Sequence, residues 1–133
     1  MLTSITTSQF TERLIYLMLS DGHYRKHLSH LQERLGEARL NAVSAFERLG
    51  MELFAEPLDG MFVWARFPHV EDSLALAESS QSAGILLAPG SVFRPHLGTS
   101  PWMRFNVTIC EDKRVQRWLE QRALTSRRVA ANA

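Results

Sequence analysis

The hydrophobic and polar positions of this chain change their period at Gly50. Before it, apolar residues recur at spacings of three and four, which is typical of amphipathic helices; after it, short stretches alternate with a period of two, which is typical of strands. The predicted elements, in chain order, are helices over 9–19 and 23–49, strands over 51–55 and 61–67 joined by a turn at 57–60, a helix over 70–83, strands over 85–88 and 102–109, and a helix over 111–124. This order predicts an α+β fold in which a small, mostly antiparallel sheet carries helices on one face.

The first predicted helix, at residues 9–19, is apolar on most of its sides. A lone surface helix has one apolar stripe, so this pattern indicates that the helix packs on something larger. We therefore expect a junction helix within residues 1–20, a compact domain at 21–125, and a small, polar tail at 126–133 that frays.

Arg104 lies in the middle of the predicted strand 102–109. With a period of two it shares a face with Trp102 and Asn106, whereas the opposite face is wholly apolar and is expected to cover a core. A guanidinium on a rigid strand is a natural receptor for a carboxylate, because two parallel N–H donors match the two carboxylate oxygens. The spacing alone leaves an alternative open, in which Arg104 pairs with an internal Asp or Glu or is simply solvated.

Composition and charge set limits on the class of protein. The chain has 133 residues and 45% hydrophobic content, which suits one globular domain. Its net charge of +1 gives no indication of a nucleic-acid or membrane partner, and its apolar stretches are too short to span a bilayer. The first residues lack the pattern of a secretion signal, and the single cysteine, Cys110, fits a reducing compartment. We expect a cytoplasmic location and a packing role for Cys110.

Other candidate chemistry is sparse. The sequence contains no Walker loop, no dinucleotide-binding loop and no G-x-S-x-G elbow. His23, His27 and His30 stack along one face of the long predicted helix, but we expect a solvated or interface face rather than a metal site, since we find no carboxylate on that stripe. His96, in a proline-containing loop, is a candidate for a second polar contact near Arg104.

Four segments, in this order, resemble the C-terminal small domain of fold-type I pyridoxal-phosphate aminotransferases. Within that group they look most like the aminotransferase-type domain of MocR (GntR-family) transcriptional regulators. Residues 21–28 resemble the entry into that domain, and residues 57–64 are similar to its P-x-G-G-x-F-x-W hairpin, with Asp59 in place of the first glycine. Residues 85–93 look like its V-x-V-x-P-G-x-x-F segment, and residues 102–106 are similar to the strand whose arginine grips the substrate α-carboxylate. The resemblance covers about residues 8–124.

The resemblance implies roles for individual residues. Arg104 would form the bidentate clamp on an amino-acid carboxylate. Gly60 would permit a close backbone approach at the hairpin, with a plain turn glycine as an equal alternative. Arg94 would face the ligand or form a surface salt bridge, and residues 89–93 would shape the loop near the domain boundary.

The resemblance also implies that the catalytic parts lie outside this chain. The family's chemistry requires pyridoxal 5′-phosphate held by a lysine, an acidic residue at the pyridine nitrogen and a phosphate-binding cup, all in the large domain. The two lysines here, Lys26 and Lys113, do not resemble that context. We therefore expect a C-terminal fragment that is inert alone, with no catalytic, cofactor-binding or metal-binding residue of its own, and with the cofactor in the parent protein.

Three functional classes stay open. The parent would be a GntR/MocR-type regulator, in which a missing N-terminal domain binds DNA, or a free-standing class I/II aminotransferase; residues 20–31 and 102–106 favour the regulator. The third class is a stand-alone carboxylate-binding or interaction module. The expected partners are an amino acid or related carboxylate, the missing large domain and a second copy in a homodimer, with no membrane partner.

Overall fold

The structure is a computed structural model, and it describes residues 7–131. The chain divides into two compact units, Met1–Arg34 and Leu35–Ala133. The sequence places this boundary at residues 20 and 21 instead, at the end of the first helix. The boundary falls within the second helix because its residues before Leu35 are exposed, whereas Ala38 is its first buried residue.

The first unit holds helix α1 (Gln9–Ser20) and the beginning of helix α2 (His23–Leu49). Both helices form where the sequence predicts them. Gly22 separates them with a φ of +72°, a backbone conformation that suits glycine. No residue of α1 is buried, and its apolar side chains are exposed.

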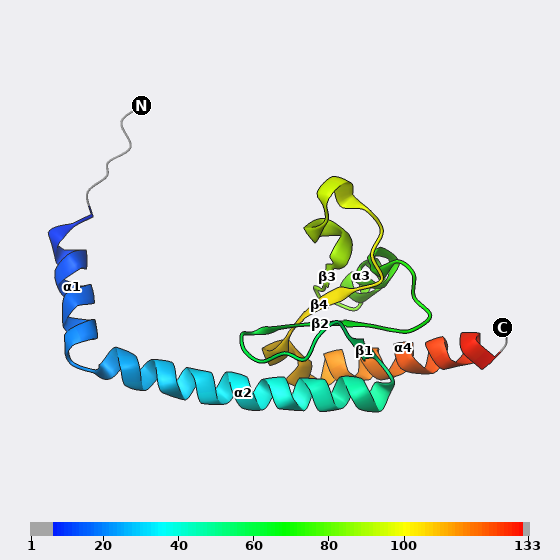
Figure 1. Cartoon of the computed structure of the whole chain (residues 1–133), viewed down its shortest axis with the longest axis horizontal. Coiled ribbons are helices and arrows are strands. Elements are labelled where there is room, and N and C mark those ends of the chain that lie inside the picture. The colour runs from blue at the N-terminus through cyan, green and yellow to red at the C-terminus, as the bar shows by residue number, and fades with distance from the viewer. Residues whose placement is uncertain (1–6, 132–133) are drawn as a thin grey trace. The chain divides into compact units, whose positions relative to one another are not determined.

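The second unit contains a four-stranded antiparallel sheet with the strand order β1-β2-β4-β3 (Figure 1). Its elements besides α2 are β1 (Glu52–Leu53), β2 (Phe62–Arg66), α3 (Ser73–Ser82), β3 (Ala88–Pro89), the 3-10 turns η1 (Gly90–Phe93), η2 (Pro95–Leu97) and η3 (Val107–Glu111), β4 (Met103–Asn106) and α4 (Lys113–Ala131). This architecture confirms the predicted α+β class.

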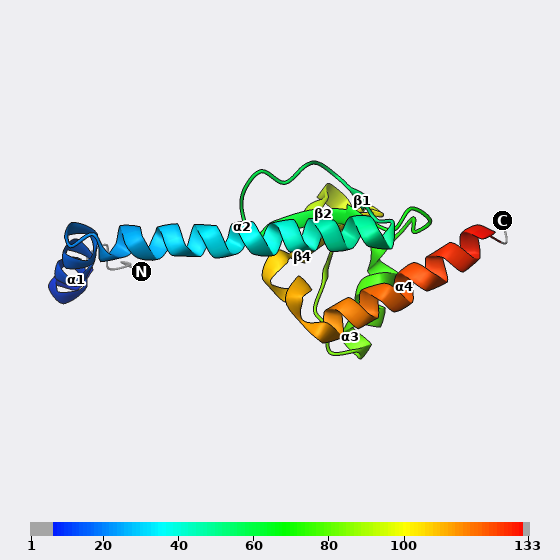
Figure 2. The ribbon, with the colours of Figure 1, turned by 90° about the horizontal axis from the view of Figure 1, so that it is seen from below.

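One face of the sheet carries the core. Alternate residues of β2 and β4 are buried there, and the ring of Phe46 from α2 lies 4.8 Å from the ring of Phe105, centroid to centroid. Figure 2 shows α2 and α4 side by side over this face. The helical residues that complete the core include Ala38, Ala42, Val115, Trp118, Leu119 and Ala123. The other face, with Trp64 and Arg104, is partly exposed.

Several elements differ from their predicted bounds; β1 and α3 are shorter at both ends, and three other differences have more consequence. Strand β4 ends at Asn106, because the Asn106 side chain accepts hydrogen bonds from the backbone N–H and the hydroxyl of Thr108, at 3.0 and 2.9 Å, and starts the turn η3. Helix α4 continues to Ala131, past the predicted end at residue 124, and its residues 126–131 are rich in the strong helix formers Arg and Ala. The expectation that the tail frays stays a prediction, and residues 132–133 lie outside the described range. The third strand begins only at Ala88, and the segment before it is not a strand.

Among the helices of the described range, none has the length and hydropathy needed to cross a bilayer.

Candidate functional site

Arg104 lies on the open face of the sheet, half-buried and in contact with two aromatic rings. Its guanidinium carbon is 4.1 Å from the ring centroid of Phe62 and 4.5 Å from that of Phe93. Among the described residues, the Arg104 side chain forms no hydrogen bond and no salt bridge; only its backbone is paired, within the sheet. The structure therefore does not support the alternative in which an internal Asp or Glu neutralises this arginine.

The neighbouring arginines do have polar partners. Arg66, also on β2's open face, donates from Nε and Nη2 to one carboxylate oxygen of Glu52, at 2.8 and 2.6 Å. Arg94 donates from Nη1 to the backbone carbonyl oxygen of Thr99 at 3.1 Å. Of these three arginines, Arg104 is the one whose guanidinium has no hydrogen-bond partner among the described residues.

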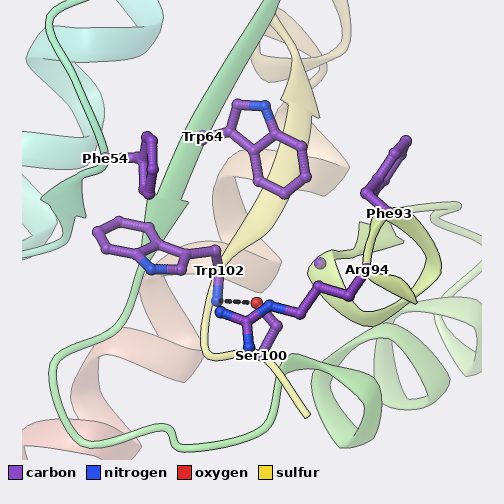
Figure 3. Close-up of a pocket in the computed structure, with 7 residues that line it drawn as sticks. Phe54, Trp64, Phe93, Arg94, Ser100 and Trp102 are labelled. Atoms are coloured by element: carbon purple, nitrogen blue, oxygen red, sulfur yellow. Dashed lines mark hydrogen bonds between the residues drawn. The ribbon is translucent and has the colours of Figure 1, made fainter. Parts of the chain in front are cut away.

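Beside Arg104 lies a cavity of about 300 Å³ with mostly aromatic walls. Figure 3 shows Phe54 and Trp102 on one side of it and Phe93 on the other, with Arg94 and Ser100 between them. Its lining residues are Phe54, Trp64, Gly90, Phe93, Arg94, Ser100 and Trp102. This volume is at the lower end of the range for small-molecule sites, so the cavity suits a ligand of amino-acid size.

The aromatic walls are held by edge-to-face contacts between rings. Trp64 meets Phe93 at 5.1 Å between centroids and 79° between planes, and Phe54 meets Trp102 at 5.1 Å and 89°. Such arrangements are favourable because the positive edge of one ring faces the negative face of the other. Phe93 contacts both Trp64 and Arg104, so it joins the cavity to the guanidinium.

A buried serine and a glycine fix the loop that carries Phe93. The Ser73 hydroxyl donates to the carbonyl oxygen of Trp102 at 2.8 Å, and the Gly90 N–H donates to the same oxygen at 2.8 Å. A Cβ atom on Gly90 would lie 2.6 Å from that oxygen, so only glycine fits against the strand there. Sequence reasoning missed Ser73, because a serine at the start of a helix carries no distinctive signal.

The other predicted residues take different places. Gly60 has a φ of +85° and open space around the position of a Cβ, which supports the turn alternative over a close approach. His96 is exposed, with a φ of +60°, and does not line the cavity, whereas Arg94 does. Burial, with a smaller contribution from the charge of Glu111, raises the pKa of the Cys110 thiol to about 12, so the thiol stays neutral. In the described residues, no three His, Cys, Asp or Glu side chains are grouped to hold a metal ion.

Comparisons with known proteins point to aminotransferases, although no family model matches the chain. The sequence is 26% identical to aromatic-amino-acid aminotransferase 1 of Thermococcus litoralis over 124 residues, which cover 91% of this chain and 30% of that protein. The multiple substrate aminotransferase of Thermococcus profundus matches the structure with a TM-score of 0.68 and 23% identity, over 87% of this chain and 29% of that one.

A second solved structure agrees. The kynurenine aminotransferase of Pyrococcus horikoshii, crystallised with PMP, matches with a TM-score of 0.67 and 24% identity, over 84% of this chain and 28% of that one. The chain shares the fold of part of these aminotransferases. It spans less than a third of the length of each, and the likenesses support the resemblance to an aminotransferase C-terminal domain.

Proposed function

We propose that this chain is the small domain of a pyridoxal-phosphate-dependent aminotransferase-like protein and binds the α-carboxylate of an amino acid through Arg104. The observation that carries the proposal is a half-buried guanidinium with no acidic partner in the described residues, placed next to a cavity of amino-acid size. The likeness to aminotransferases supports the same ligand class.

The chemistry of the site follows from its surroundings. Arg104 offers two parallel N–H donors to the two carboxylate oxygens, and this charge-assisted pair is stronger than a neutral hydrogen bond. The surrounding rings exclude water from part of the guanidinium, which strengthens its attraction for an anion. The aromatic cavity then receives the remainder of the ligand and fixes its orientation relative to the carboxylate.

The cofactor does not fit the residues of this chain. Pyridoxal phosphate needs a lysine, and both Lys26 and Lys113 are exposed and outside the lining of the cavity. We therefore propose that the cofactor, which supplies an electron sink during transamination, belongs to a large domain of the parent protein, and that this chain alone is inert. A borohydride-stable adduct between pyridoxal phosphate and one lysine of this chain would contradict this.

For the parent, we propose the effector domain of a GntR/MocR-type transcriptional regulator, in which a separate N-terminal domain binds DNA. The segments at residues 20–31 and 102–106 support this assignment. The alternatives are a free-standing aminotransferase and a stand-alone carboxylate-binding module. These three are separated by measuring the mass of the natural polypeptide in source cells and sequencing its N-terminal part. A basic winged-helix segment supports the regulator, and a large domain without such a segment supports the enzyme. A polypeptide of 15.1 kDa supports the module.

The exposed apolar side chains of α1 support a further partner. A helix with such a surface needs a cover, which in our proposal is the large domain of the parent, or a second copy in a homodimer. Size-exclusion chromatography of the chain with and without residues 1–20 tests the homodimer: a dimer that becomes a monomer on truncation supports it, and a monomer in both cases contradicts it.

The carboxylate site is tested by titrating the chain with L-leucine and with L-leucinol, which lacks the carboxylate. Arg104→Lys should weaken leucine binding by about 2–5 kcal/mol, because one partner of a charge pair loses its bidentate geometry. Arg66→Lys is the matched control, since Arg66 lies on the same face but is already paired with Glu52. Leucine binding that is unchanged in Arg104→Lys would show that Arg104 is structural.

A further inference from the structure

The guanidinium of Arg104 is shared by two rings that come from separate elements. Phe62 belongs to β2 and Phe93 ends the turn η1. The guanidinium carbon of Arg104 lies within 4.5 Å of both ring centroids, so it contacts both rings. Each ring attracts the cation through its negative face.

The sheet register brings Phe62 within reach of Arg104. Trp64 lies directly opposite Arg104, and Phe62 lies two residues before it on the same face of β2. Diagonal neighbours on an antiparallel pair are about 7–8 Å apart, a distance that an aromatic ring and a long arginine side chain bridge easily. Phe93 is positioned differently: it belongs to the loop that the hydrogen bonds of Gly90 hold beside β4.

The exposure of these rings argues against a role in the core. Phe62 is 40% exposed and Phe93 is 46% exposed, although they belong to a unit with a well-buried core on the opposite face of the sheet. A phenylalanine ring carries no hydrogen-bond acceptor atom, so these two contacts leave the N–H donors of Arg104 without an acceptor. The rings therefore restrict the orientation of Arg104 without occupying its donors.

We infer that Phe62 and Phe93 are positioning residues that hold the guanidinium of Arg104 with its N–H edge toward a planar oxyanion, and that they make Arg104 selective for carboxylates. The inference rests on the proposed function, in which Arg104 binds the carboxylate. An arginine held in place before binding loses less conformational freedom when the ligand arrives, and the corresponding gain in affinity is about two- to tenfold.

The test uses the whole chain with ¹⁵N-labelled arginine and follows the Nε–H resonance of Arg104, identified by its loss in Arg104→Lys. The variants are Phe62→Leu and Phe93→Leu, with the tyrosine variants at both positions to restore the ring. Phe54→Leu is the control for the Nε–H spectrum alone, because the Phe54 ring contacts Trp102 rather than Arg104. Since Phe54 lines the cavity, its variant is not a control for leucine affinity. Each sample is titrated with L-leucine and with L-leucinol.

In the unliganded chain, we expect the ring-current shift of the Arg104 Nε–H proton to fall in both leucine variants and to persist in the tyrosine variants and in Phe54→Leu. The dissociation constant for L-leucine should rise about two- to tenfold in each leucine variant and recover with tyrosine. A purely structural role of the two rings would not produce this recovery together with the spectroscopic change.

Two results would overturn the inference and are distinguishable. In the first, Arg104→Lys loses leucine binding while both leucine variants keep the affinity and the Nε–H shift of the natural chain; that result contradicts the inference alone and leaves the proposed function in place. In the second, leucine binding survives in Arg104→Lys, which contradicts the proposed function, and the inference with it.

Discussion

Replacing Gly90 with alanine tests how closely the cavity loop is held against the sheet. The added Cβ would lie 2.6 Å from the carbonyl oxygen of Trp102 and 2.9 Å from Cβ of Ser100. Both neighbours are constrained: one is backbone, and the other belongs to a buried residue. The loop must move, with an overpacking cost of about 1–3 kcal/mol. The movement also weakens the hydrogen bond from the Gly90 N–H to Trp102, whose net contribution is about 0.5–1.5 kcal/mol.

The expected loss for Gly90→Ala is therefore about 1.5–4.5 kcal/mol in the free energy of unfolding. Urea unfolding followed by tryptophan fluorescence measures it, and the midpoint should fall by about 1–2 M for an m-value of about 2 kcal/mol/M. Gly98→Ala is the matched control, because Gly98 has a φ of −59° and no atom lies within 4 Å of the position that a Cβ would take there, so this variant should be neutral or slightly stabilising. Equal stability of Gly90→Ala and the natural chain would refute the argument that this loop is sterically locked.

Two further predictions concern other parts of the chain. Gly36→Ala, in the middle of α2 with open space around it, should raise the free energy of unfolding by about 0.5–1 kcal/mol in the same assay, and a loss of stability would show a close contact there. The Cys110 thiol should resist alkylation at pH 8 in the folded chain and react when the chain is unfolded by urea. Burial raises the pKa of the folded thiol from the ordinary 9.0 to about 12. The contribution of the neutral thiol to the free energy of unfolding is therefore complete below pH 9 and is lost as the pH rises toward 12, with a slope of at most about 1.4 kcal/mol per pH unit. A Cys110→Ala variant should lack this alkaline decline.

Much of the fold is predictable because local signals and burial agree. Helix α2 begins and ends where the pattern predicts, between Gly22 and Gly50, and both glycines take positive φ values of +72° and +74°. Strand β4 is predicted too long, because the apolar alternation continues past Asn106 while the Asn106 side chain already starts a turn. A period of two reports burial, and it does not report a hydrogen bond that competes with the strand.

The site is predictable only in part for the same reason. The alternation of buried and exposed residues around Arg104 places its side chain on the uncovered face of the sheet, and the sequence of this one strand is sufficient to predict that. Its contacts with Phe62 and Phe93, however, depend on the register of β2 against β4 and on the anchoring of Gly90. Neither is visible in local periodicity, because both arise from pairing between distant segments.

The register also explains why Arg104, rather than Arg66, is available to a ligand. Arg66 lies directly opposite Glu52 of β1 and pairs with it, whereas the residues opposite Arg104 are Trp64 and Ala88, which offer no acceptor side chain. This predicts that Ala88→Glu would place a carboxylate opposite Arg104, as Glu52 is placed opposite Arg66.

Opposite charges facing each other across strands attract by about 0.2–1 kcal/mol, and the new carboxylate would in addition compete directly for the donors that a ligand needs. Leucine binding should therefore weaken at least several-fold in Ala88→Glu, while the uncharged Ala88→Gln, of similar shape, should retain more of it. Equal leucine affinity in the two variants would show that Arg104 does not reach its cross-strand neighbour, and that its free donors have a cause other than register.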